Sequence, residues 1–233
     1  KSFFISHALL MVLYYAGIHQ DPSYDIKSIS IQFDDRFSDV SRQVLEQHIS
    51  LLVRNNVNNF VHIINGIQQQ YEYIEKVDVH FVAPSTLKVV FLSHVPLCVI
   101  NENLLLLTSG ILTQRDYYVQ TALVDLPLIN VDPSQLSTCS WSTLVACISS
   151  IDRQFFDRFS VSYDDQCQLI FNHTVNPRCS LVCRSDFEFK NLKLYEKAVF
   201  TLIEQRKSIA QFENIAWTAD LRFEKQIILK NNR

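Results

Sequence analysis

The scarcest residue in this chain is glycine, and its scarcity limits the loops that the backbone can form. Only Gly17, Gly66 and Gly110 occur in 233 residues, whereas average usage of about 7% would give roughly sixteen. Phosphate-binding loops need several glycines close together, because only glycine lets the backbone wrap closely around an anion. The chain therefore lacks a dinucleotide fingerprint and a P-loop. We expect no cofactor and no small-molecule substrate.

Composition and charge narrow the function classes further. Hydrophobic residues make up 48% of the chain, and 21 basic against 24 acidic residues give a net charge of −3. This length is typical of one large domain or two small ones with a true core. A nucleic-acid surface would need a basic face, so we expect no nucleic-acid partner. No set of histidines, carboxylates or serines has a diagnostic catalytic spacing, so we predict no enzyme and no catalytic residue.

An apolar run stands at the start of the numbering. Residues 3–18 read FFISHALLMVLYYAGI and would span roughly 24 Å as a helix, against about 30 Å for a hydrocarbon core. We predict a membrane helix over residues 1–20 that contacts the lipid bilayer through residues 3–18. A signal-peptide core and a buried amphipathic helix are the alternatives.

Six cysteines allow more than one interpretation. They are Cys98, Cys139, Cys147, Cys167, Cys179 and Cys183. Disulfides fit an oxidising compartment, and buried free thiols fit a core, because cysteine packs as a small apolar residue. The spacing of Cys167, His173, Cys179 and Cys183 matches no common zinc ribbon, so we expect no metal site.

Hydrophobic periodicity predicts an α+β fold whose first part has the order βααββ. We expect a strand at 26–33, helices at about 38–54 and 56–70, and strands near 77–81 and 86–93. One face of the first helix is expected to pack on the core. Its apolar residues are Val40, Val44, Leu45, Ile49 and Leu52.

The second part of the chain alternates strands and helices. We expect short strands between 96 and 113, one helix over 141–156 and another over 191–207. Further strands are expected at 157–163, 167–172, 178–183, 213–223 and 225–231. The predicted arrangement is a mixed α/β domain with an antiparallel sheet that ends in an edge strand. The predicted domains are therefore a membrane helix at 1–20, a βααββ domain at 24–95 and this larger domain at 96–233.

Several motifs, taken in order, resemble the FtsQ/DivIB family of bacterial cell-division proteins. A βααββ unit after a membrane helix resembles a POTRA domain, and IEKVDVHFVAPSTLKVVFLSHVP at 74–96 is similar to its final hairpin. LLTSGIL (106–112) and DLPLIN (125–130) resemble two short elements of the following family domain. WTADLRFEKQIILK (217–230) is similar to the family's last two strands, with Phe223 where tyrosine is more usual.

The resemblance implies a non-enzymatic scaffold of the divisome. Members of the family are single-pass proteins of the bacterial inner membrane, with most of the chain in the periplasm at the division septum. They bind the small division proteins FtsB and FtsL, and the resemblance implies that binding occurs by strand addition at the C-terminal edge. Such binding has a plain physical basis, because an edge strand carries unpaired N–H and C=O groups.

The candidate partner-binding residues lie in and around the last strand. They are Trp217, Arg222, Phe223, Lys225, Gln226, Ile227, Ile228 and Lys230. Ile227 and Leu229 are expected on one face of the strand, and Gln226, Ile228 and Lys230 on the other. Alternatively, this strand completes the core with solvated lysines at its edge, Trp217 packs in the core, and Asp220 and Arg222 form a structural pair.

Two other functions remain open at this point. A POTRA-bearing component of outer-membrane protein assembly or secretion shares the βααββ unit, although such proteins usually continue into a long membrane β-barrel. An unrelated membrane-anchored binding domain is the other alternative.

Overall fold

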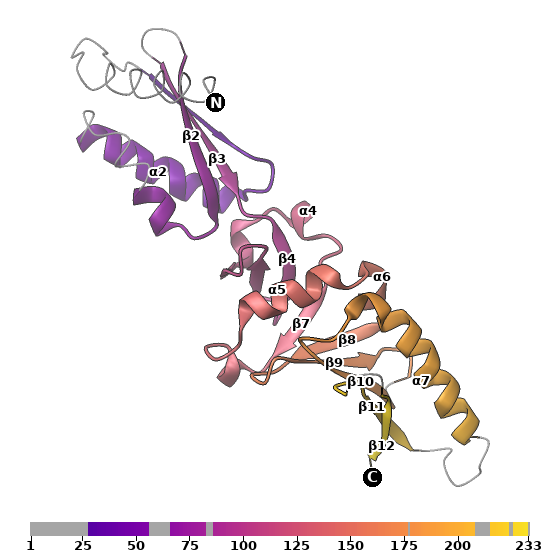
Figure 1. The fold of residues 1–233 in the computed structure, drawn as a ribbon. Helices are drawn as coiled ribbons and strands as arrows, with labels where there is room; N and C mark the ends of the chain where they lie inside the picture. The colour runs from indigo at the N-terminus through magenta and orange to yellow at the C-terminus, as the bar shows by residue number, and fades with distance from the viewer. Residues whose placement is uncertain are drawn as a thin grey trace, which may run out of the picture. The chain divides into compact units, whose positions relative to one another are not determined.

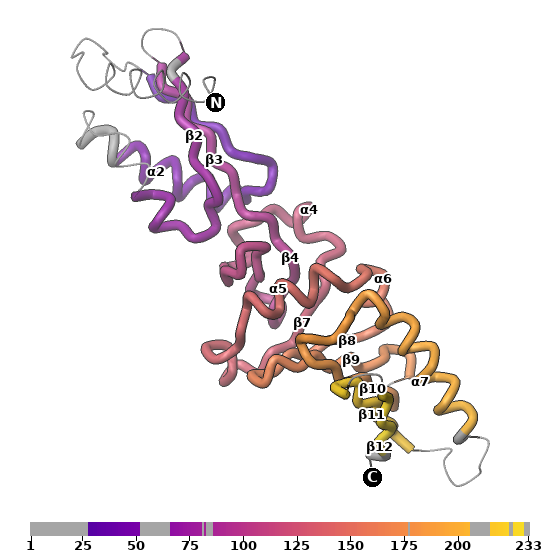
Figure 2. The backbone as a smooth tube through the Cα atoms, in the orientation of Figure 1, coloured from indigo at the N-terminus to yellow at the C-terminus, as the bar shows by residue number. Residues whose placement is uncertain are grey.

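The computed structural model describes residues 28–55, 66–82, 86–176, 178–207, 215–223 and 226–232 (Figures 1 and 2). The chain divides into two compact units, Lys1–Ser93 and His94–Arg233. The predicted membrane helix at 1–20 lies outside the described residues. None of the described helices combines the length and apolar character needed to cross a bilayer.

The first unit contains a three-stranded sheet and α2 (Asp39–Asn55). Its strands are β1 (Ser28–Phe33), β2 (Ile74–Val82) and β3 (Thr86–Ser93), in the order β1-β3-β2. β1 runs parallel to β3, and β2 is antiparallel to it. Residues 66–70 are also helical, while the rest of the helix predicted for 56–70 lies outside the described residues. The strands and α2 lie where the periodicity predicts them.

The core of this unit corrects one part of the predicted helix face. Leu45 and Ile49 of α2 are buried as expected, but Val40 and Val44 are 55% and 37% exposed. An α-helix turns about 100° per residue, so Val40 and Val44 lie about 140° and 100° around the axis from Leu45. Leu45 and Ile49 define the inward face, and the two valines face solvent.

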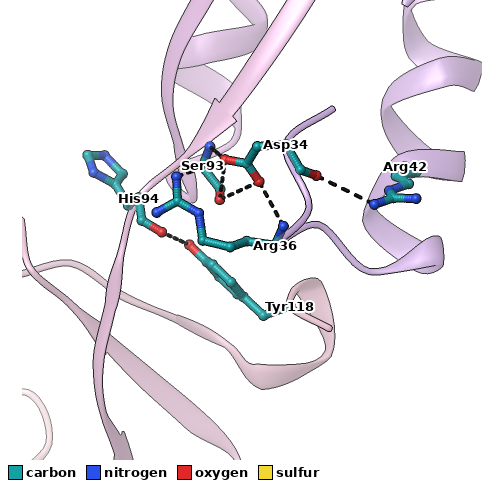
Figure 3. A network of polar contacts seen from close by, with 6 residues as sticks. All are labelled: Asp34, Arg36, Arg42, Ser93, His94 and Tyr118. Carbon is teal, nitrogen blue, oxygen red and sulfur yellow. Dashed lines mark hydrogen bonds and ion pairs between the residues drawn. The ribbon is translucent and has the colours of Figure 1, made fainter. Parts of the chain in front are cut away.

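A carboxylate joins the ends of β1 and β3 (Figure 3). The Asp34 side chain accepts hydrogen bonds from the Ser93 amide at 2.8 Å and the Ser93 hydroxyl at 3.0 Å. It also pairs with the Arg36 guanidinium at 2.9 Å. At the start of the second unit, the Tyr118 hydroxyl donates a hydrogen bond to the His94 carbonyl at 2.9 Å.

Among the described residues of the second unit, nine strands form one sheet. They are β4 (Pro96–Ile100), β5 (Leu104–Leu107), β6 (Leu112–Gln114), β7 (Leu128–Val131), β8 (Phe159–Tyr163), β9 (Gln168–His173), β10 (Cys179–Arg184), β11 (Ala216–Asp220) and β12 (Ile228–Asn232). Their order is β12-β11-β10-β9-β8-β7-β4-β5-β6. The pairs β4/β7, β7/β8 and β10/β11 are parallel. The prediction of an antiparallel sheet is therefore wrong, and the sheet is mixed.

Crossover connections explain the parallel pairs. α5 (Trp141–Ser150) and α6 (Arg153–Phe156) connect β7 to β8, and α7 (Leu192–Lys207) connects β10 to β11. Parallel neighbours need such long connections, whereas antiparallel neighbours can be joined by a tight turn. The short helix α4 (Gln120–Leu123) lies between β6 and β7. α5 and α7 lie on one side of the sheet in Figure 1 and share one apolar core with it.

The helix predicted over 141–156 is in fact two helices. Ile151 has extended backbone angles and ends α5. Asp152 then caps α6, because its side chain accepts a hydrogen bond from the Gln154 amide at 3.1 Å. An aspartate in this position is a strong N-cap, and it outweighs the continuing apolar periodicity.

The six cysteines are all free, and five of them are buried. The disulfide interpretation is therefore wrong, and the interpretation as buried thiols holds for all but the half-buried Cys167. Burial raises the pKa of Cys98 to about 12 and that of Cys147 to about 11. Within the described ranges, no three His, Cys, Asp or Glu side chains come together as a metal-binding group.

Candidate functional site at the C-terminal sheet edge

β12 is the outermost described strand on one side of the nine-stranded sheet. It pairs antiparallel with β11, with Asp220 opposite Ile228 and Thr218 opposite Lys230. Among the predicted site residues, Trp217 lies in β11, and Ile228 and Lys230 lie in β12. The others follow β11 or precede β12: Arg222, Phe223, Gln226 and Ile227. Lys225 lies outside the described residues.

The direction of the backbone groups of β12 follows from the hydrogen bonds on the far side of β11. The amides of Trp217 and Leu221 donate to carbonyls of the β10 side, at 2.6 and 2.8 Å. The N–H and C=O of one strand residue point to the same side, and successive residues alternate. The backbone groups of the even-numbered residues of β11 therefore point toward β12. Ile228 and Lys230 lie opposite Asp220 and Thr218, so their backbone groups point toward β11.

The remaining backbone groups of β12 point away from the sheet. By the same alternation, the N–H and C=O groups of Leu229 and Asn231 face outward. No other described strand pairs with this edge, and an edge of this kind is a template for another strand. No proline stands in β12 to interrupt it.

The side chains of this strand alternate as the sequence predicts. Ile227 and Leu229 are half-buried and pack against the core of the second unit. Ile228 and Lys230 occupy the opposite face, where Lys230 is exposed. Core packing thus anchors one face of β12, Lys230 is exposed on the other face, and the outer backbone groups point away from the other described strands of the sheet.

A buried carboxylate ties the edge strand to its neighbour. Asp220 is only 1% exposed. Arg222 donates to it from Nε at 2.8 Å and from Nη2 at 2.7 Å, and Lys230 Nζ donates to Oδ2 at 2.7 Å. The hydrogen bonds from Arg222, with a further one from Lys230, hold the pKa of Asp220 well below its usual range, although burial opposes this shift.

Arg222 and Lys230 therefore have a structural role at this edge. Arg222 also reaches across to β9, where its Nη1 lies 3.0 Å from Gln168 Oε1. Two cations share one carboxylate, so the cluster keeps a net positive charge. Gln168 is 54 residues from Arg222 in the chain, and no sequence signal indicates this contact, because the strand order is set by the whole sheet.

The two aromatic candidates have different environments. Trp217 is 3% exposed and belongs to the apolar core, so core packing describes its role in this structure. Phe223 is 49% exposed in the connection between β11 and β12. Among the described residues near this edge, Phe223 offers a partner an exposed aromatic ring, and aromatic residues are enriched in binding hot spots.

No protein-family model matches the chain, and no curated protein matches it.

Proposed function

We propose that this chain is a non-enzymatic scaffold of the bacterial divisome, similar to FtsQ/DivIB proteins. In this proposal it is a single-pass protein of the inner membrane with its bulk in the periplasm. The first unit is a POTRA domain, and the second is the family's C-terminal β domain. The partners are FtsB/FtsL-like proteins, which add a strand to β12.

The open backbone edge of β12 is the observation that carries this proposal. The outward groups of Leu229 and Asn231 offer a partner strand hydrogen bonds without any rearrangement of the sheet. The Asp220 ion pairs and the packed side chains of Ile227 and Leu229 hold the strand in register. A preformed edge lowers the ordering cost of binding.

The fold of the first unit supports the POTRA part of the proposal. A strand, a helix, a helical segment and a two-stranded hairpin follow one another, and the sheet order is β1-β3-β2. The same arrangement serves the alternative, a component of outer-membrane protein assembly or secretion. The two functions differ in their partners. A divisome scaffold would bind an FtsB/FtsL-like protein, whereas an assembly component would bind an unfolded outer-membrane protein.

Replacing Asn231 with proline tests the strand-addition proposal. Asn231→Pro removes an outward N–H and places a ring on the binding edge, but it breaks no hydrogen bond to β11. Asn231→Ala is the matched control, because alanine keeps the N–H. Affinity of the full chain for an immobilised FtsB-like partner is measured by biolayer interferometry. We expect the proline variant to bind at least tenfold more weakly, or about 1.4 kcal/mol, and the alanine variant to bind as the parent does.

Two outcomes would count against the proposal. Equal affinity of the proline variant and the parent, with both folded by circular dichroism, would show that the partner does not use this edge. Absence of binding to the FtsB-like partner together with binding to an unfolded outer-membrane protein would support the assembly function instead.

A further inference from the structure

A cleft of about 410 Å³ opens on the helical side of the second unit, away from the residues of the β12 edge. It lies where the end of α5, the helix α6 and the start of α7 meet. Its lining comes from two stretches of chain about thirty residues apart. The lining residues are Ser149, Ser150, Ile151, Asp152, Gln154, Phe155, Arg158, Phe189, Lys190, Leu192 and Lys193.

The apolar part of this cleft is recessed. Four of its lining side chains are buried, and they form its floor: Ile151, Phe155, Phe189 and Leu192. The polar lining residues Ser149, Gln154, Lys190 and Lys193 are exposed and form its rim. A recessed apolar floor with a few polar groups around it is typical of a site for a ligand. A flat bilayer surface does not fit such a shape.

Basic side chains outnumber acidic ones in the lining itself. Arg158, Lys190 and Lys193 contribute three cations, and Asp152 contributes the one carboxylate of the lining. Asp152 is already engaged, because it caps α6 through the Gln154 amide. Lys190 makes only a loose pair with Glu188 at 3.9 Å. Among the described ion pairs, none involves Lys193. Glu196 and Glu188 lie outside the lining and balance Arg158 and Lys190, so Lys193 is the lining cation that these ion pairs leave for an anionic ligand.

Arg158 is held in place for such a ligand. Its Nη1 donates to the buried Glu196 carboxylate at 2.6 Å, and its guanidinium lies over the Phe155 ring at 5.6 Å. Glu196 is the only side chain that this guanidinium hydrogen-bonds among the described residues, so most of its five N–H donors are available. A planar guanidinium that is already oriented loses little entropy when it binds a carboxylate.

We propose that this cleft binds an acidic peptide segment of a partner protein. A glutamate or aspartate of the segment pairs with Arg158 and Lys193 at the rim, and a neighbouring apolar side chain occupies the floor. This surface is separate from the β12 edge, so the inference does not depend on the strand-addition proposal.

The test uses a fluorescein-labelled, end-blocked hexapeptide of glutamate, leucine and serine, with the full chain in nanodiscs of neutral lipid. Fluorescence polarisation gives the affinity. Lys193→Glu should weaken binding about tenfold or more, since it replaces an attraction with a repulsion. Arg153→Glu is the matched control, because it makes the same charge change on α6 outside the lining, and it should change the affinity less than threefold. Ser149→Trp, which fills the cleft without changing charge, should also weaken binding.

Two peptide controls and one protein control separate the alternatives. A peptide with glutamine for glutamate should lose most of its affinity, and so should one with alanine for leucine. Asn231→Pro should leave hexapeptide binding unchanged. The proposal for the cleft is therefore tested independently of the proposal for the β12 edge. Equal weakening by Lys193→Glu and Arg153→Glu would overturn the proposal. Displacement of the peptide by millimolar inorganic phosphate, or binding only in nanodiscs of anionic lipid, would also overturn it.

Discussion

Lys230 Nζ lies 2.7 Å from Asp220 Oδ2, so an ion pair joins the outermost strand of the second unit to its neighbour. In the ladder Lys230 stands opposite Thr218, and Asp220 stands opposite Ile228. The pair is therefore diagonal and lies on one face of the sheet. A slip of one residue would move Lys230 to the core face, so this contact helps to set the register of β12.

Removing the carboxylate should destabilise this edge. Asp220→Asn leaves Arg222 and Lys230 without a charged partner, and hydrogen bonds to charged groups contribute about 1.5–3 kcal/mol each. Because both cations are partly exposed to solvent, we expect a total loss of only about 1–3 kcal/mol. Urea unfolding monitored by circular dichroism gives the free energy. Asp186→Asn is the control: its pair with Arg184 is exposed on both sides, and we expect a change below about 0.5 kcal/mol.

Acidification should reveal the same pair. The pKa of Asp220 is lower in the folded chain than its ordinary value near 3.9. The carboxylate therefore stabilises the fold fully above that ordinary pKa, and this contribution is lost as the pH falls toward the folded pKa. Thermal unfolding gives the melting temperatures of the parent and of Asp220→Asn from pH 7 to pH 2. The difference between the two melting temperatures should be constant above about pH 5. The difference should shrink below about pH 4, and a difference that instead grows on acidification would contradict this account.

Two glycines should respond to alanine with opposite signs. Gly110 has φ +85°, and no atom lies closer than 3.8 Å to a Cβ placed there, so the cost of Gly110→Ala is backbone strain alone, about 1–2 kcal/mol. Gly66 lies in a helical segment with open space around it. Gly66→Ala should therefore stabilise the first unit by about 0.5–1 kcal/mol. Chemical denaturation of both variants gives the change in the free energy of unfolding. Destabilisation by Gly66→Ala as well would mean that a side chain at residue 66 lacks the space it needs.

The thiols should differ in reactivity. Only thiolates react with alkylating agents at useful rates. Cys98 and Cys147 are buried, and their pKa values are raised to about 12 and about 11. Cys167 is half-buried. Brief treatment of the native chain with iodoacetamide, followed by peptide mass spectrometry, should label Cys167 first. Early labelling of Cys98 would mean that the core opens on the timescale of the experiment.

Local patterns in the sequence predict most elements but not their arrangement. The strand β3 and the helix α7 follow from alternation and from helical spacing, because each signal lies within a single segment. The parallel pairing of β10 with β11 depends on where a crossover helix returns to the sheet, and no single segment carries that information. Val40 shows the same limit, because its apolar side chain fits a helical pattern but faces solvent.

The candidate site follows a similar division. Alternation along residues 227–230 predicts the two faces of β12 correctly, whereas its outward backbone groups follow only from the hydrogen bonds of Trp217 and Leu221. The contact of Arg222 with Gln168 joins β9 to the end of β11 across the intervening strand. It depends on the strand order of the whole sheet.

The position of β12 in the chain has a consequence for biosynthesis. It follows every other strand of the sheet in sequence, yet it forms the outer edge at one end. Because ribosomes deliver a chain from its N-terminus onward, this edge is added after the rest of the sheet has been made. Chains cut short before Ile228 by proteolysis or early termination would lack it altogether. A partner that recognises β12 would thus bind chains whose sheet includes this strand and pass over chains cut short before it.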